Sequence, residues 1–271
     1  MLSRARIDEL LTGHGLAPRR DLGQNFVGDP NTVRRIARLA GVGAGDHVVE
    51  IGAGVGSLTL ALVETGAAVT AVEVDRGLVR VLHEVLAGSD VRIVEGDALR
   101  LDWPHVLGDE RWILVANLPY NVATPLVADL LDGVPQIERM LVMVQREVGE
   151  RLCAAPRTPA YGAVSVKVAF WATSRIVGLV PASVFVPRPN VESALVEITR
   201  RPSPATDAPP AELFRLVRTA FGQRRKMLRR SLADVVASAT FVDAGIDATR
   251  RPEELDVVEW GRLTNAHLAA G

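Results

Sequence analysis

The chain has 271 residues, enough for one large domain and a smaller one, and with 48% hydrophobic and 23% charged residues it has the composition of an ordinary globular protein. It contains no apolar run of membrane-spanning length and no apolar stretch near its start that would mark a secretory signal. The single cysteine, Cys153, excludes an internal disulfide and a cysteine-built zinc site, so we expect a protein of the reducing cytoplasm.

The formal net charge of −1 argues weakly against a nucleic-acid partner, but the charges are unevenly distributed. Residues 1–38 carry seven basic against four acidic side chains, and residues 186–231 carry ten against four. Residues 39–185 are acidic, with 17 acids against eleven bases, as are residues 232–271, with seven against three. The basic segments could face a polyanion, although solvated arginines scattered over the surface would give the same counts.

Residues 46–145 alternate short apolar runs with helical stretches. The predicted strands cover residues 47–52, 68–74, 91–95, 112–117 and 139–145. The predicted helices between them cover about residues 57–65, 77–87 and 124–131. Strands that are almost continuously Val, Ile and Leu belong to a parallel sheet covered on both faces. This pattern predicts a doubly wound α/β domain.

The pattern changes after Tyr161. Two longer strands are predicted at 164–170 and 191–199, and we expect them to close one edge of the sheet as an antiparallel pair joined by a proline-rich loop. Residues 201–210 have the composition of a linker, and everything after them is helical in pattern. We therefore predict an α/β domain at 1–200 and a small all-helical domain at 201–271.

A glycine-rich turn follows the first predicted strand, in the sequence Val49-Glu-Ile-Gly-Ala-Gly-Val-Gly-Ser. Gly52 and Gly54 let the backbone approach a ligand closely, and a nucleotide-like cofactor is expected at the carboxyl end of this strand. Glu73 ends the second strand, about 20 residues further on, where a carboxylate can accept hydrogen bonds from both ribose hydroxyls. The GxGxG spacing and the preceding Glu50 favour S-adenosylmethionine over a nicotinamide dinucleotide, which stays an alternative here.

Asp97 follows the third strand, in Glu95-Gly-Asp-Ala. Its carboxylate could accept a hydrogen bond from the exocyclic amine of the cofactor's adenine. An Asp in this position could equally be a helix cap.

Asn117-Leu-Pro-Tyr-Asn ends the fourth predicted strand and resembles the signature of methyltransferases that act on an amino group attached to a planar ring. Adenine N6 is a poor nucleophile because its lone pair is delocalised into the ring. The Asn117 side-chain oxygen and the Leu118 carbonyl can both accept from N6, which favours a more tetrahedral nitrogen. Pro119 stiffens the turn, and Tyr120 offers a ring face for the extruded base. These residues need no general base and no metal, because a sulfonium is an excellent leaving group and positioning carries the catalysis.

With these residues identified, the chain resembles the ribosomal RNA adenine dimethyltransferase family over nearly its whole length. Leu22-Gly-Gln-Asn-Phe-Val-Gly-Asp is similar to the family's N-terminal Gly-Gln-Asn-Phe-Leu element, which implies cofactor-binding roles for Asn25 and Val27. Val186-Pro-Arg-Pro-Asn-Val-Glu-Ser-Ala resembles its Phe-x-Pro-x-Pro-x-Val-x-Ser segment, which implies that Phe185 is a second aromatic wall beside the target base. The resemblance places further cofactor contacts at Gly52, Glu73, Asp97 and Asn117. It implies a class I S-adenosylmethionine-dependent methyltransferase fold.

Two segments resemble the small-subunit (KsgA) type of the family rather than the Erm resistance enzymes. One is Gln145-Arg-Glu-Val, and the other is Phe221-Gly-Gln-Arg-Arg-Lys-Met-Leu-Arg-Arg-Ser-Leu. The second predicts a basic helix that could neutralise several RNA phosphates, although it could also be an ordinary solvated helix. Its cations are Arg224, Arg225, Lys226, Arg229 and Arg230.

The resemblance implies a substrate: two adjacent adenines in a hairpin loop near the 3′ end of 16S rRNA, each dimethylated on the assembling small subunit by a monomeric enzyme. Three alternatives remain open from the sequence. They are an Erm-type enzyme that modifies 23S rRNA, an assembly factor acting mainly by binding, and a nicotinamide dehydrogenase.

Overall fold

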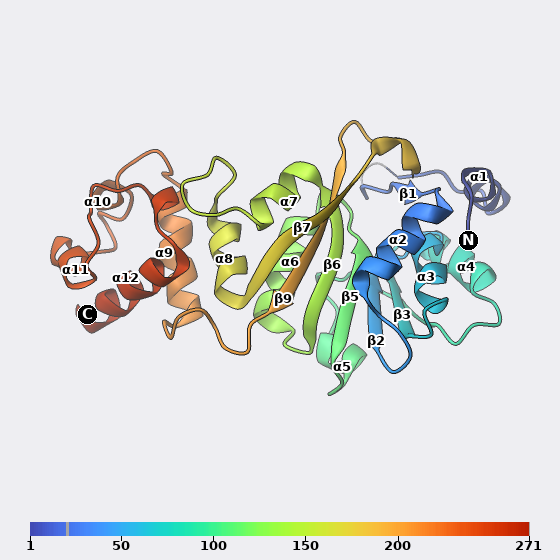
Figure 1. Ribbon diagram of the computed structural model, residues 1–271, viewed down its shortest axis with the longest axis horizontal. Coiled ribbons are helices and arrows are strands. Elements are labelled where there is room, and N and C mark those ends of the chain that lie inside the picture. Colours follow the sequence, from blue (N-terminus) through green and yellow to red (C-terminus); the bar gives the residue numbers. More distant parts are fainter. Residues whose placement is uncertain (20–21, 271) are drawn as a thin grey trace. The chain divides into compact units, whose positions relative to one another are not determined.

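The computed structural model describes residues 1–19 and 22–270. The chain divides into two compact units, and each is composed of two segments. Met1–Gly149 forms the first unit together with Arg175–Arg200, and Glu150–Ser174 forms the second together with Arg201–Gly271. The elements of both units are labelled in Figure 1.

A seven-stranded sheet in the order β4-β3-β2-β5-β6-β9-β7 is the centre of the first unit (Figure 1). The first five strands of this order are parallel, and β9 runs antiparallel to β6. Their bounds are β2 His47–Ile51, β3 Ala68–Glu73, β4 Arg92–Glu95, β5 Trp112–Asn117, β6 Ile137–Gln145, β7 Ala172–Val180 and β9 Ser193–Arg200. The five strands predicted between residues 46 and 145 are confirmed, and so is the doubly wound α/β class.

Helices lie on both faces of this sheet (Figure 1). The helices of this unit are α1 Arg4–Gly13, α2 Pro30–Ala40, α3 Ser57–Val63, α4 Arg76–Val85, α5 Trp103–Leu107, α6 Ala123–Gly133 and α7 Arg146–Leu152, the last running into the second unit. α2 shows how local sequence sets the bounds. The Asp29 carboxylate accepts from Thr32 N at 2.9 Å, Pro30 fits the first turn, and Gly41 ends the helix in the left-handed region at φ 58°.

A two-stranded ribbon joins the N-terminal segment to the proline-rich loop. β1 (Phe26–Val27) pairs antiparallel with β8 (Phe185–Val186), which follows the 3-10 turn Ala182–Val184. The Gly28 N–H continues the contact by donating to the Val184 carbonyl at 2.8 Å. Residues some 160 positions apart in sequence, 26–28 and 184–186, are thereby held side by side.

The strand predicted at 164–170 is wrong, because these residues form α8 (Ala163–Trp171). The Ser165 hydroxyl accepts from Gly162 N at 3.0 Å and so satisfies a free donor at the helix start. Val166 and Phe170, four residues apart, are both buried against the helices of the second unit. The alternating valines fit a strand as well as a helix, and this packing decides for the helix. The strand at this edge of the sheet is instead β7, which directly follows α8.

The second unit is entirely helical except where β7 begins, as predicted for residues 211–271. Its further elements are α9 Pro210–Phe221, α10 Leu228–Ser231, α11 Ser238–Asp243, the 3-10 turn Pro252–Glu254 and α12 Val257–Ala270. Phe170 packs edge-to-face on Phe214, at 5.2 Å between ring centroids, in the core that also contains Trp260. The predicted boundary at 201 therefore differs from this division, since residues 150–174 pack with the C-terminal helices.

The predicted basic helix at 221–232 is also wrong. α9 ends at Phe221 and α10 begins only at Leu228, with an extended Met227 (φ −62°, ψ 152°) before it. Leu228 N donates to the Arg250 carbonyl at 2.8 Å and Arg229 N to the Ala248 carbonyl at 3.0 Å. These backbone donors are satisfied by a distant segment, so the helix is interrupted there and the cations lie on a loop and a short turn of helix.

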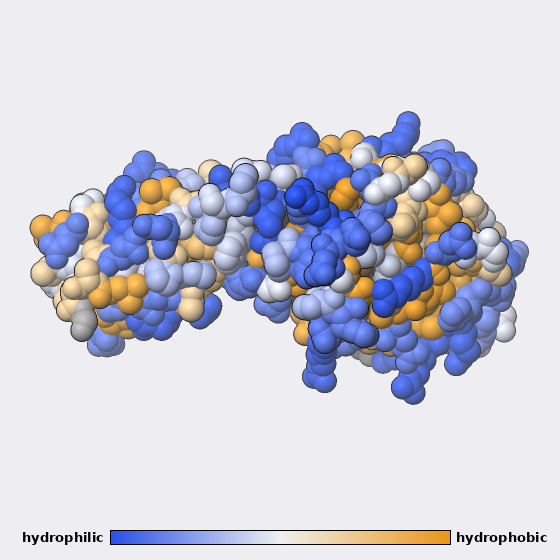
Figure 2. Space-filling view, turned by 90° about the horizontal axis from the view of Figure 1, so that it is seen from below, coloured by the Kyte–Doolittle hydropathy of each residue, from blue (hydrophilic) through white to orange (hydrophobic). Residues whose placement is uncertain are grey.

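None of the helices in the described part of the chain is long and apolar enough to cross a membrane. On the face seen in Figure 2, hydrophobic residues are interspersed with hydrophilic ones.

Phe170→Ala tests the assignment of residues 150–174 to the helical unit. Removing a fully buried ring leaves a cavity, so we expect a decrease of about 3–5 kcal/mol in the free energy of unfolding. Hydrogen exchange should show reduced protection in α9 and α12. Reduced protection confined to the strands β2–β5 would contradict the assignment.

Candidate functional site

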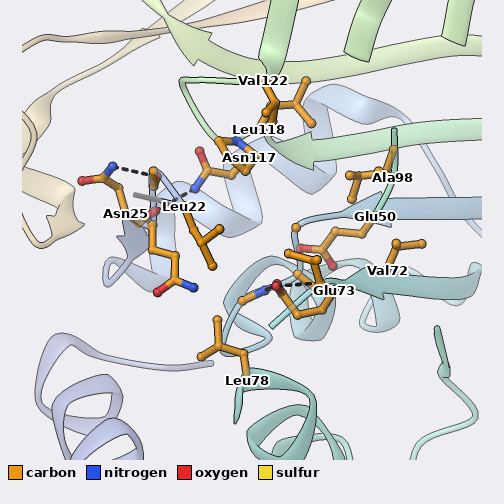
Figure 3. A pocket seen from close by; sticks show the side chains of 18 of the residues that line it. Leu22, Asn25, Glu50, Val72, Glu73, Leu78, Ala98, Asn117, Leu118 and Val122 are labelled. Atoms are coloured by element: carbon orange, nitrogen blue, oxygen red, sulfur yellow. Dashed lines mark hydrogen bonds between the residues drawn. The ribbon is translucent and has the colours of Figure 1, made fainter. Parts of the chain in front are cut away.

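A pocket lies at the carboxyl ends of the parallel strands, where β2 and β5 are neighbours (Figure 3). From β2 the chain proceeds to β3 on one side, and from β5 it proceeds to β6 on the other. The loops that leave β2 and β5 therefore diverge, and a crevice opens between them. The pocket is lined by these loops, by the ends of β3 and β4, and by the N-terminal segment 22–27.

The glycine-rich turn after β2 forms one wall of the pocket, as predicted. Gly52 and Gly54 have φ angles of 73° and 60°, a region that L side chains rarely adopt. A Cβ on Gly54 would lie 2.9 Å from the Phe26 ring, and one on Gly52 would lie 3.5 Å from Pro119. The glycines thus allow the N-terminal segment and the Pro119 turn to pack closely on this loop.

Glu73 lies at the end of β3 with its carboxylate beside the glycine turn (Figure 3). One oxygen accepts from Gly54 N at 2.8 Å, and the other accepts from Val74 N at 2.9 Å and Asp75 N at 3.0 Å. Only 5% of the residue is exposed. Burial raises the pKa of Glu73, whereas the three N–H groups favour the ionised form and limit the rise. The carboxylate keeps lone pairs for a further donor, such as a ribose hydroxyl.

Glu50 is a second acid in the pocket; its place before the glycines favoured S-adenosylmethionine in the sequence, but no contact was predicted for it. It is 2% exposed, and within the described residues its Oε2 atom has no hydrogen-bond partner. Burial, with the nearby Glu73 carboxylate, raises the pKa of Glu50 to about 8. The Ser57 hydroxyl, on the next helix, is also buried at the pocket, and no described residue is its hydrogen-bond partner. An acid inside an otherwise apolar strand was the signal that could have identified Glu50.

Asp97 lies at the rim, in the loop after β4. Its Oδ1 accepts from Leu99 N at 3.0 Å, so it caps its own loop and also lines the pocket. Two apolar side chains next to it are unusually exposed, Val74 at 49% and Leu99 at 42%, and both line the pocket. The sequence did not single them out, because exposure is decided by the fold.

The N-terminal segment closes the pocket from the side of the β5 loop. Asn117 Nδ2 donates to the Asn25 carbonyl at 2.9 Å, as Figure 3 shows. Gly23, at φ 64°, lies so close to the Pro119–Asn121 turn that an added Cβ would be 3.0 Å from Asn121 Oδ1. Val27 lines the pocket while its side chain is buried in the core. The structure therefore brings together Asn25, Val27 and Asn117, for which the resemblance implied contacts with the cofactor.

The Asn117–Tyr120 turn presents acceptors to the pocket. Leu118 N donates to the Met143 carbonyl at 3.0 Å, which fixes the turn onto β6. In the described chain no hydrogen bond is made to the Leu118 carbonyl. The Tyr120 hydroxyl is 2.9 Å from the Ser193 hydroxyl, and its ring is half-buried. Burial raises the pKa of Tyr120, so this phenol is neutral at ordinary pH.

The prediction that Phe185 forms a second aromatic wall is wrong in this structure. The ring is fully buried in the core, in the cluster that includes Val33 and Ile36 of α2. It does not line the pocket, because the pairing of β8 with β1 turns this residue inward.

The five predicted RNA-binding cations lie in the second unit. Arg224 is paired with Glu253 and also donates to the Pro159 carbonyl. Arg225, Lys226 and Arg230 are exposed, and none has an ion-pair partner in the described chain. Arg229 contacts the Met227 sulfur at 3.7 Å.

These groups fit S-adenosylmethionine. Val74 and Leu99 would provide apolar walls for an adenine ring beside the Asp97 carboxylate, and Glu73 would provide acceptors for a ribose. The unpartnered Glu50 oxygen fits a cationic group. No arginine, lysine or histidine is found among the described residues that line the pocket, so its charge complements a cation. The same part of the chain contains no cluster of side chains suited to a metal ion.

The chain is similar to known proteins over most of its length. A family model described as ribosomal RNA adenine dimethylase matches residues 15–266. A Bifidobacterium longum protein named ribosomal RNA small subunit methyltransferase A is 44% identical over 292 residues, with 100% of this chain and 95% of that protein covered. A protein of the same name from Cutibacterium acnes is 45% identical over 287 residues, with 100% and 96% covered.

Two solved structures are similar as well. A dimethyladenosine transferase from Plasmodium falciparum has a TM-score of 0.75 and 22% identity, covering 87% of this chain and 94% of that one, which shows the shared fold. The 23S rRNA methyltransferase ErmE has a TM-score of 0.67 and 26% identity, covering 89% and 98%.

Glu73→Ala tests the cofactor site. Without the ribose acceptors, S-adenosylmethionine binding should weaken by about 1.5–3 kcal/mol, measured by calorimetry. The matched control is Glu95→Ala, which removes the acid paired in register with Glu73 on β4 but outside the pocket. Equal affinities for the two variants would exclude Glu73 from the site.

Proposed function

The chain belongs to the ribosomal RNA adenine dimethylase family, with S-adenosylmethionine as its cofactor, and we propose that it dimethylates N6 of two adjacent adenines near the 3′ end of 16S rRNA. The proposal includes the hairpin loop as the target, the assembling small subunit as the substrate, and a monomeric enzyme. Relatives that are 44–45% identical over the full chain are named for the small subunit, which supports this target over the 23S rRNA of ErmE, at 26% identity.

The observation that carries the proposal is the orientation of the Asn117 side chain. The Asn25 carbonyl can only accept, so the 2.9 Å contact fixes Nδ2 as the donating end of the amide. Oδ1 is then the end left free, and Asn117 lines the pocket. The N-terminal segment thus holds Asn117 as an acceptor aimed into the site before any substrate enters.

Two acceptors act on the target amine. In the first transfer, Asn117 Oδ1 and the Leu118 carbonyl each accept one N6 hydrogen, which draws the nitrogen towards a tetrahedral geometry and frees its lone pair; in the second transfer, one of the two accepts the single remaining hydrogen. The bound cofactor supplies an electrophilic methyl group on a sulfonium. These residues orient the nucleophile, and the N6 proton is lost to solvent once the nitrogen has gained its fourth bond. Rigid placement of the acceptors lowers the barrier because no reorganisation is needed during the reaction.

Tyr120 binds the extruded adenine by stacking. Its hydroxyl is held by Ser193, at the start of β9, so the ring has a fixed orientation. A base stacked on such a ring gains about 1–3 kcal/mol. The contact restores part of the energy lost when the adenine leaves its own stack.

The exposed cations between residues 225 and 230 bind the RNA backbone. They extend from a loop and a short turn of helix in the helical unit, and Arg225, Lys226 and Arg230 have no ion pairs within the described chain. Unpaired cations can neutralise phosphates without first breaking a salt bridge. Arg224 is engaged with Glu253 and serves the loop's own structure.

Asn117→Ala tests the chemistry. Because the lost acceptor would act on the reacting amine in the transition state, the single-turnover rate of the variant should be lower by a factor of about 10²–10³. The measurement is labelled methyl transfer to undermethylated small subunits at saturating cofactor. A rate within about threefold of the wild type would reject this role, because a group acting mainly in the transition state contributes far more. Mapping the labelled nucleotides in the wild-type reaction tests the proposed adenines directly.

Neutralising Arg225 and Lys226 together tests the RNA contact. We expect weaker binding to small subunits and a slope of log affinity against log salt that is smaller by roughly 0.7–0.9 for each phosphate that is no longer neutralised. Cofactor affinity should not change. The charge-matched control neutralises Arg38 and Arg111, which are exposed near the amino-terminal edge of the sheet, opposite the pocket. Overlapping salt titrations for the two double variants would rule out the contact.

A further inference from the structure

Two buried carboxylates point into the same part of the pocket, Glu50 from β2 and Glu73 from β3 (Figure 3). The two carboxylates differ in the hydrogen-bond donors around them. Glu73 accepts from three backbone N–H groups, which stabilise its negative charge. The Glu50 Oε2 atom accepts from no group of the described chain, although only 2% of the residue is exposed.

The groups around Glu50 stabilise its charge poorly. From β3 it faces the Glu73 carboxylate, which repels it, and from α3 only the neutral Thr59 hydroxyl favours the ionised form. The described lining of the pocket contains no basic side chain. An unpaired carboxylate in such a place binds a proton rather than stay ionised. When two acids share a site and one is stabilised by N–H donors, the other is the one that remains protonated.

We propose that Glu50 is protonated in the free protein and releases this proton when the cofactor binds, so that cofactor uptake and proton release are coupled. The O–H bond of the Glu50 carboxyl breaks, the proton goes to solvent, and the new carboxylate faces a positive charge of the cofactor. The inference rests on the proposed function only in taking S-adenosylmethionine as the ligand. It makes Glu50 a positioning residue whose charge state follows the occupancy of the pocket.

The cation that Glu50 faces has two possible sources, the sulfonium and the α-ammonium group of S-adenosylmethionine. S-adenosylhomocysteine retains the ammonium group but has a neutral thioether. Proton release with both ligands identifies the ammonium, and release with S-adenosylmethionine alone identifies the sulfonium. In the second case the pocket would favour fresh cofactor over spent product as long as Glu50 is ionised.

Calorimetry in two buffers with different ionisation enthalpies counts the protons released on binding. At about pH 6.5 the α-ammonium of the ligand stays protonated, since such groups titrate near 7.7–8.0. We expect the wild type to release close to one proton per S-adenosylmethionine bound, and Glu50→Gln to release none. Asp97→Asn, which alters an exposed acid of the same pocket, should bind more weakly but release as many protons as the wild type.

Binding of S-adenosylmethionine to the wild type without proton release, or equal release by Glu50→Gln, would overturn the inference and leave the proposed function intact. Failure of the wild type to bind the cofactor would contradict both. Wild-type affinity should rise up to tenfold per pH unit below about pH 8, and that of Glu50→Gln should not.

A second measurement needs no ligand. A folded-state pKa raised above the unfolded value stabilises the fold most at low pH, and this stabilisation is lost as pH rises towards the folded pKa, here about 8. Glu50→Gln resembles the protonated form at every pH. The melting temperature of the variant relative to the wild type should therefore increase from about pH 5 to pH 8. A constant difference would show that Glu50 is ionised in the free protein.

Discussion

The parallel pairing of β2 with both β3 and β5 is the constraint on which the rest of this structure depends. It places the carboxyl ends of three strands at one edge of the sheet, and with them Glu50, Glu73 and Asn117. The chain leaves β2 and β5 in opposite directions, so the pocket opens between two loops rather than inside either. Every group that we assign to the cofactor or the target base lies at this edge of the sheet or in the N-terminal segment 22–27, which packs against it.

The N-terminal segment contacts both the Asn117 turn and the glycine turn. The Asn25 carbonyl orients the Asn117 amide, and Phe26 packs on the glycine turn at Gly54. Through β1 the same segment pairs with β8, in the loop that leads to Ser193. The N-terminal segment, the Asn117 turn and the β8 loop are therefore joined to one another by hydrogen bonds. Under the proposed function, Asn25 therefore sets the geometry of the reaction although it has no chemical role of its own.

The charge of the pocket follows from burial. Acids enclosed without a basic partner favour a bound cation, and the described residues that line the pocket supply no such partner to the buried Glu50 and Glu73. The exposed cations from 225 to 230 lie in the other unit, so the groups that we propose for the cofactor and those that we propose for the RNA are on different parts of the chain. The net charge of −1 does not show that the acids of the pocket and these cations lie in different units.

The sequence by itself determined the doubly wound sheet, the glycine turn, and the placement of Glu73 and Asn117 at strand ends, because each depends on a local pattern: apolar strands, a glycine spacing, a polar residue at a strand end. It could not determine α8, whose alternating valines suit either a strand or a helix until Val166 and Phe170 pack. It also could not determine that Phe185 is buried, that the basic segment is broken at Met227, or that Glu50 has an unpartnered oxygen. These depend on contacts between residues far apart in the chain, and only the tertiary structure decides whether a side chain finds a partner, a core or solvent.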